Sequence, residues 1–134
     1  MNIKQAVPLF NVANIETSLR FYADGCGFTM TNFWKPEGKL RWCMLQRDGV
    51  NLMLQEYLPA NLPQEKLGTG VAINFFCKDA VALYHEFKAR NIEASRPFVG
   101  NGMWVTAVTD PDGYRLEFQS ITDAPEESEY SEAD

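Results

Sequence analysis

The feature that most constrains the fold is a pattern of helix caps, buried helix positions and turns that occurs twice, 64 or 65 residues apart. Asn14 corresponds to Asp79, and both residue types cap helix N-termini well. The turn pair Asp48-Gly49 corresponds to the pair Asp112-Gly113. Few residues are identical between the halves, so the repeat is one of physical roles. It predicts two copies of one supersecondary unit.

Each half is expected to form a strand, a helix and three further strands. In the first half, apolar periodicity and Gly or Pro breaks predict strands at 4–12, 28–34, 39–46 and 51–57, with a helix at 15–24. In the second half they predict strands at 71–77, 103–109 and 114–120, a strand starting at 92, and a helix from 80 to about 90. Residues 1–122 are then one domain of two modules, about 4–57 and 70–120, joined by a connector at 58–69.

The stretch DPDGYRLEF, residues 110–118, shows how the strands divide their two faces. Its first four residues favour a tight turn. After the turn, Leu116 and Phe118 alternate with Arg115 and Glu117, so one face of the strand is apolar and the other carries a carboxylate. The same alternation in the other strands predicts an α+β fold of two βαβββ modules. Each would be a curved mixed sheet with a helix on its apolar outer face, and the mixed face would line a ligand cleft.

Charge and composition exclude several classes of function. The net charge of −6 comes from the segment 123–134, which holds six acidic and no basic residues, so a flexible acidic tail is expected there. Lys and Arg form no stripe with interleaved aromatic residues, which argues against nucleic-acid binding. No apolar run has membrane-spanning length, and the N-terminus lacks an apolar signal-peptide core, so a cytoplasmic protein is expected. The three cysteines fit no disulfide or zinc spacing and are interpreted as reduced packing residues.

The doubled βαβββ pattern, the stretch NIETSLRFY after the first strand and the closing DPDGYRLEF resemble the vicinal oxygen chelate superfamily. This superfamily includes glyoxalases, extradiol dioxygenases and bleomycin-resistance proteins, and VPLFNVANIETSLRFY is most similar to the bleomycin-resistance branch. The resemblance covers residues 4–120. It implies modules that curl into half-barrels around a cleft, and a homodimer for a chain of this length.

The resemblance also implies four metal-ligand positions, which in the enzymes are typically His, Gln or Glu. In this chain they are Val7, Met53, Ala72 and Glu117. A divalent ion needs several nitrogen or oxygen ligands, and only Glu117 supplies one. The single histidine, His85, is expected on the solvent side of its helix. We therefore expect no metal, no cofactor and no catalytic residue.

The candidate binding residues are polar or aromatic side chains on strands that border the cleft in the family. They are Asn11, Trp34, Trp42, Met53, Tyr57, Asn74, Trp104, Arg115 and Glu117. The pattern leaves open which face Trp42 and Trp104 take, and whether Glu117 is paired with a neighbour such as Arg115 or contacts a ligand.

Three functions remain open at this point. The first is a non-catalytic protein that holds a small aromatic or amphipathic molecule, such as an antibiotic, between its modules. The second is a glyoxalase-like or dioxygenase-like enzyme with unconventional metal ligands. The third is an interaction module without a small-molecule ligand.

Overall fold

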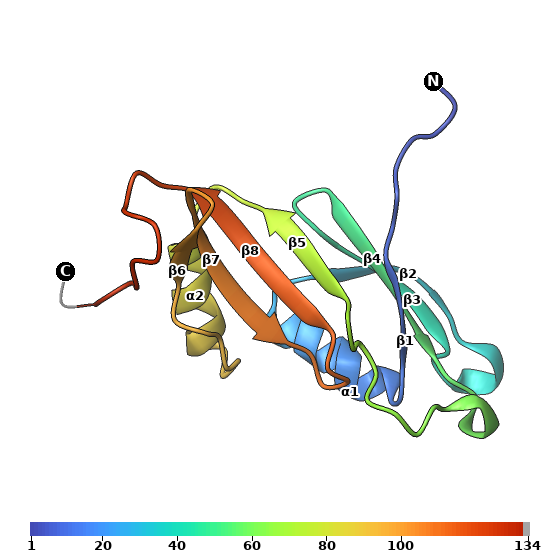
Figure 1. Cartoon of the computed structure of the whole chain (residues 1–134). Coiled ribbons are helices and arrows are strands. Elements are labelled where there is room, and N and C mark those ends of the chain that lie inside the picture. Colours follow the sequence, from blue (N-terminus) through green and yellow to red (C-terminus); the bar gives the residue numbers. More distant parts are fainter. Residues whose placement is uncertain (133–134) are drawn as a thin grey trace. The chain divides into compact units, whose positions relative to one another are not determined.

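The computed structural model describes residues 1–132 and divides the chain into two compact units, Met1–Leu67 and a second unit that begins at Gly68. The boundary falls inside the segment 58–69 that the sequence marks as a connector. Each unit contains one four-stranded sheet and its own α-helix (Figure 1).

The first unit has a mixed sheet in the order β1-β4-β3-β2. Strand β1 is parallel to β4, and the other neighbours are antiparallel. The elements in chain order are β1 (Leu9–Val12), α1 (Ile15–Arg20), the π-helical turn η1 (Phe21–Gly25), β2 (Thr29–Trp34), the 3-10 turn η2 (Pro36–Gly38), β3 (Trp42–Arg47), β4 (Val50–Glu56) and the 3-10 turn η3 (Pro59–Asn61).

The second unit repeats this topology in the order β5-β8-β7-β6, with β5 parallel to β8. Its elements are β5 (Ala72–Phe76), α2 (Ala80–Ala89), β6 (Phe98–Gly100), β7 (Met103–Thr109) and β8 (Arg115–Ile121). The predicted α+β fold of two βαβββ modules is therefore confirmed.

Both helices begin at the predicted caps. The Asn14 side chain accepts the N–H of Thr17 at 3.1 Å, and the Asp79 side chain accepts the N–H of Ala82 at 2.9 Å. The first helix is α-helical only as far as Arg20 and then widens into η1, whereas a uniform helix was expected. Among residues 1–132, no helix is long and apolar enough to cross a bilayer.

The core of the first unit lies between its sheet and its helix. Ile15 and Tyr22 have no exposed surface, and the rings of Tyr22 and Phe10 are 6.1 Å apart. The buried strand residues are Phe10, Val12, Cys43, Leu45, Leu52 and Leu54. Burial raises the pKa of the Cys43 thiol to about 11, which fits its interpretation as a reduced packing residue.

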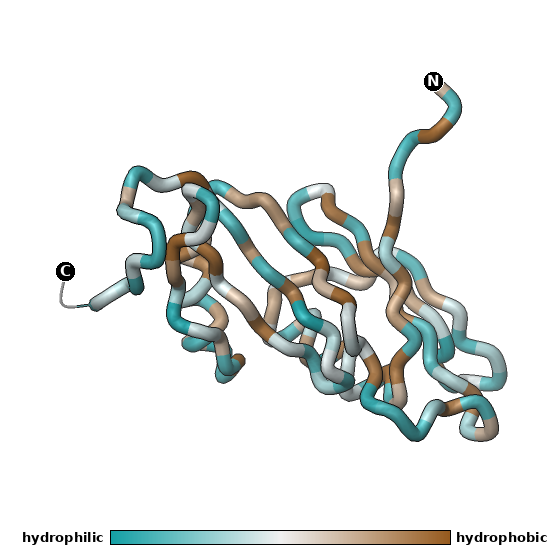
Figure 2. Tube along the Cα trace, in the orientation of Figure 1, coloured by the Kyte–Doolittle hydropathy of each residue, from teal (hydrophilic) through white to brown (hydrophobic). Residues whose placement is uncertain are grey.

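The second core is built in the same way. Ser120 accepts the first N–H of α2, from Ala80, at 2.8 Å, and the Thr106 hydroxyl donates to the Ala80 carbonyl at 2.8 Å. The rings of Phe87 and Phe118 pack edge to face with their centroids 5.1 Å apart. Figure 2 shows apolar and polar residues alternating along the strands, which places one apolar face of each sheet under its helix.

Three strands begin at least three residues later than the sequence predicts: β3 starts at Trp42 instead of residue 39, and β1 and β6 also start late. Strand β1 starts at Leu9 instead of residue 4, because Pro8 has no N–H to donate to a neighbouring strand. The strand expected from residue 92 starts at Phe98. Asn91, with φ of 64°, follows the end of α2, and only an isolated bridge at Ala94 precedes β6.

The acidic segment after β8 lies along the edge strand β6. The Val99 N–H donates to Ser128, the Glu127 N–H donates to Val99, and the Tyr130 N–H donates to Pro97. The flexibility of this tail stays a prediction, but between Glu127 and Tyr130 its backbone is hydrogen-bonded to Val99 of β6 and to Pro97, the residue before β6. This pairing covers the backbone groups that an edge strand otherwise exposes.

Candidate functional site

The face of the first sheet that points away from α1 carries aromatic and amide side chains in rows. We call it the open face of unit 1. Because paired residues on neighbouring strands share a face, the register places Trp34, Trp42, Gln55 and Asn11 in one row across the four strands. The next row contains Asn32, Met44, Met53 and Leu9. Trp34 is 60% exposed.

Four of the predicted binding residues are thus brought together on this face: Asn11, Trp34, Trp42 and Met53. A fifth, Tyr57, follows β4 directly and donates its N–H to Val12 at 2.9 Å. Two tryptophans beside two amides provide a flat apolar surface with hydrogen-bonding groups next to it, which is the composition of small-molecule sites.

A cavity of about 530 Å³ adjoins this face where β2 and β4 end and the antiparallel strand β3 begins. It is lined by Trp34, Pro36, Glu37, Lys39, Arg41, Gln55, Glu56 and Leu58. Trp34 and Gln55 belong to both the cavity and the open face. Of the lining residues, Trp34 alone was among the predicted binding residues. One signal for the others was present in the sequence: Glu56 continues the apolar series Leu52, Leu54 with a charged residue.

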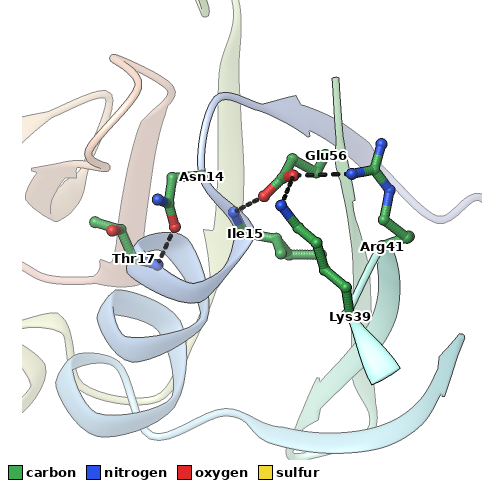
Figure 3. A network of polar contacts seen from close by, with 6 residues as sticks. All are labelled: Asn14, Ile15, Thr17, Lys39, Arg41 and Glu56. Carbon is green, nitrogen blue, oxygen red and sulfur yellow. Dashed lines mark hydrogen bonds and ion pairs between the residues drawn. The ribbon is translucent and has the colours of Figure 1, made fainter. Parts of the chain in front are cut away.

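Glu56 is the centre of a network in this cavity (Figure 3). One carboxylate oxygen accepts the N–H of Ile15, the first residue of α1, at 3.0 Å. The other lies 3.1 Å from both the Lys39 ammonium and a guanidinium nitrogen of Arg41. The Glu56 side chain is 9% exposed. A carboxylate this deeply buried is stabilised by its partners.

Several effects act on the pKa of Glu56. Burial alone raises the pKa, but the hydrogen bonds from Ile15 and Lys39 and the positive charges of Lys39 and Arg41 outweigh burial and hold the pKa below its ordinary value. The carboxylate is therefore ionised at neutral pH, and it neutralises part of the positive charge in the cavity.

This lowered pKa predicts a pH-dependent stability. Because the folded-state pKa of Glu56 lies below its unfolded value, its contribution is complete above about pH 4.3, the ordinary pKa of Glu, and is lost as pH falls through the folded-state pKa. Urea unfolding of the wild type and of Glu56→Gln between pH 7 and pH 3 measures this. The difference in free energy of unfolding should shrink on acidification, and a constant difference would contradict the assignment.

The second sheet has its own group of predicted residues on the face away from α2. Glu117 pairs in register with Asn74 on β5. The Arg115 guanidinium lies 3.4 Å from the Glu117 carboxylate, and the Gln119 amide donates to Asn74 at 2.6 Å. Of the two roles left open for Glu117, the structure shows the pairing with Arg115.

Trp104 does not join this group. It pairs in register with Ser120 and Val99, residues of the face that packs on α2, and its ring lies 6.1 Å from that of Tyr130. The Tyr130 hydroxyl is in turn 3.0 Å from His85, which is exposed as predicted. The C-terminal segment and α2 thus provide the surroundings of Trp104, and its role in ligand binding stays a prediction.

The residues at the four family metal positions do not fit a divalent ion. Val7, Met53 and Ala72 offer no nitrogen or oxygen side-chain donor, and Glu117 is paired with Arg115. Within residues 1–132, no three His, Cys, Asp or Glu side chains gather closely enough to hold a metal.

Two βαβββ units in one chain, each a mixed four-stranded sheet with its own helix on one face, define the class of paired βαβββ proteins. The family follows from the sequence. Residues 3–118 match the Glyoxalase/Bleomycin resistance protein/Dioxygenase superfamily, and the chain belongs to it. A search of curated proteins found no match.

Solved structures show the same fold at low sequence identity. A bleomycin-binding protein complexed with bleomycin aligns with a TM-score of 0.71 and 20% identity, covering 90% of this chain and 100% of the other. A bleomycin resistance determinant encoded on the transposon Tn5 aligns with a TM-score of 0.71 and 21% identity, and the alignment covers 89% of this chain and 98% of the other. TnmS3, an antibiotic binding protein from Streptomyces sp. CB03234, aligns with a TM-score of 0.69 and 20% identity, and the alignment covers 91% of this chain and 99% of the other.

Proposed function

We propose that this protein is a non-catalytic binding protein that holds a small aromatic or amphipathic molecule on the open face of unit 1. The observation that carries the proposal is the row of Trp34, Trp42, Gln55 and Asn11, beside a cavity of ligand size. The solved structures with the same fold include a bleomycin-binding protein and an antibiotic binding protein, which supports this class of ligand.

The lack of suitable metal ligands favours binding over the enzymatic alternative. Family enzymes use a divalent ion, whereas the corresponding positions here hold two aliphatic residues, a thioether and the ion-paired Glu117. No residue pair in the open face combines a nucleophile with a general base. The expected homodimer belongs to the same proposal, and light scattering of the purified protein tests it.

Tryptophan fluorescence tests the proposal with known compounds. Bleomycin and three naphthalene derivatives, namely 2-naphthoate, 2-naphthamide and 2-naphthylmethylamine, are titrated into wild-type protein. At least one should quench the emission saturably, and Trp34→Ala should weaken its binding about tenfold, because stacking on an aromatic ring contributes about 1–3 kcal/mol.

Two controls sharpen this test. Trp104→Phe removes a tryptophan from the helix face of the second sheet, outside the proposed site, so the affinity should be unchanged; a loss of affinity would instead support the sequence-based prediction that Trp104 binds the ligand. Thermal denaturation with and without Mn²⁺, Ni²⁺ or Zn²⁺ should give the same midpoint. Absence of binding by all four compounds would remove the proposal, and a stoichiometric, stabilising metal would favour the enzyme instead.

A further inference from the structure

We infer that the ligand carries an anionic group, a carboxylate or a phosphate, that Lys39 and Arg41 bind in the cavity while its ring lies against Trp34. This inference rests on the proposed function and names the chemistry of the ligand. Three observations carry it. Arg41 has N–H donors beyond those that contact Glu56, the Glu56 carboxylate is already paired with both cations, and the second unit caps its helix without such cations.

Arg41 has donor capacity beyond its ion pair. Its side chain is 18% exposed, and its contact with Glu56 uses one terminal nitrogen, Nη1, at 3.1 Å (Figure 3). A guanidinium has five N–H donors arranged as a planar fork that matches two oxygens of a carboxylate or phosphate. Lys39, whose side chain is 64% exposed, adds a second cation within the same cavity lining.

Glu56 does not offer a corresponding site for a cation. One of its oxygens accepts the Ile15 N–H, and the other is shared by Lys39 and Arg41. A cationic ligand that approached Glu56 would meet the positive charges of Lys39 and Arg41, which already contact the carboxylate. An anionic ligand adds a partner to both cations without breaking the contacts of Glu56.

The second unit shows that the helix does not require this charged cluster. At the position corresponding to Glu56, 64 residues on, Ser120 accepts the first N–H of α2 with a neutral hydroxyl. Opposite Ser120 on β7 is Trp104, whereas opposite Glu56 the chain has Arg41, whose carbonyl accepts the Glu56 N–H. A positively charged pair such as Lys39 and Arg41 is therefore present at this position in unit 1 and absent at the corresponding position of the second unit. Capping the first N–H of a helix does not explain it, because Ser120 does the same in the second unit without a cation.

The remaining lining fits the rest of such a ligand. Trp34 and Leu58, which are 60% and 57% exposed, provide apolar surface, and Gln55 provides an amide. Two lining residues, Glu37 and Glu56, carry a charge that opposes an anion, and of these Glu56 is already paired with Lys39 and Arg41. Glu37 lies exposed at φ of 54° in η2, and its replacement by Gln should strengthen anion binding two- to threefold.

Matched ligands provide the test in the intact wild-type chain. Calorimetric titration compares 2-naphthoate and 2-naphthyl phosphate with the isosteric neutral 2-naphthamide and with cationic 2-naphthylmethylamine. The anions should bind at least tenfold more tightly than the amide at 50 mM NaCl, and the preference should decrease at 500 mM NaCl. The better of the two anions identifies the head group.

Variants assign the preference to the cavity. Arg41→Gln should reduce the affinity for 2-naphthoate at least tenfold and leave that for 2-naphthamide unchanged. Lys39→Gln, which affects an exposed side chain and so preserves the fold, should reduce the affinity for 2-naphthoate about threefold. Arg20→Gln removes an exposed charge from α1 and should change neither affinity.

The outcomes separate this inference from the proposed function. Equal binding of the anion, amide and amine by the wild type would overturn the anionic ligand and leave an aromatic-binding protein in place. A preference for the anion that Lys39→Gln and Arg41→Gln both retain would overturn the assignment to these residues. Absence of binding by every compound would remove both.

Discussion

Replacing Glu56 with alanine is expected to lower the free energy of unfolding by about 2–4 kcal/mol. The substitution leaves the buried Ile15 N–H without its acceptor and Arg41, which is largely buried, without its carboxylate. The exposed Lys39 contributes little, because solvent screens its charge. Urea unfolding at pH 7, followed by circular dichroism, measures the change.

Two comparisons identify the source of this effect. Glu56→Gln keeps an oxygen that can accept the Ile15 N–H and should recover part of the loss. Glu117→Ala, on the corresponding strand of the second unit, removes a carboxylate whose partner Arg115 is 47% exposed, and should cost less than about 1 kcal/mol. If the two alanine variants were equally stable, burial of the Glu56 network would not be the cause.

Replacing Gly68 with alanine is expected to cost about 3 kcal/mol or more. Gly68 has φ of +74°, and a Cβ there would lie 2.6 Å from the Gly113 carbonyl oxygen and from the Tyr114 nitrogen. These are backbone atoms of the turn before β8, where Asp110 accepts the N–H of Tyr114 at 2.8 Å and that of Asp112 at 2.9 Å. The turn would have to shift, and the start of β8 with it.

Gly70→Ala is the matched control. Gly70 has nearly the same φ, +78°, but a Cβ there meets nothing within 4 Å. It should therefore cost only about 1 kcal/mol, the penalty of the left-handed conformation alone. Thermal unfolding of both variants gives the difference, and similar losses would show that the contact with the turn contributes nothing.

The helix caps and turns were predictable because they depend on residues close in sequence. Asn14 and Asp79 cap their helices through N–H groups three residues on, and the turn at Asp110 closes within four residues. The alternation along β4 and β8 likewise assigned buried and open faces, since side chains alternate with a period of two in any strand.

The faces of the tryptophans depended on strand register, which the sequence pattern left open. Trp42 is opposite Gln55 and falls on the open face, whereas Trp104 is opposite Ser120 and falls on the helix face. A shift of one residue exchanges the two faces, so a pattern without a known register does not decide between them.

The sequence by itself determined that this chain contains two βαβββ modules, where their helices begin, and that three of the four family metal positions lack a ligand. The tertiary structure alone decided the row of Trp34 and Trp42 and the cavity beside it. The hydrogen bond from the Ile15 N–H to the Glu56 carboxylate joins residues that are 41 positions apart in the sequence. Such contacts arise only when strands pair and a helix packs on them. For the same reason Arg41 emerged as a candidate binding residue only from the folded chain.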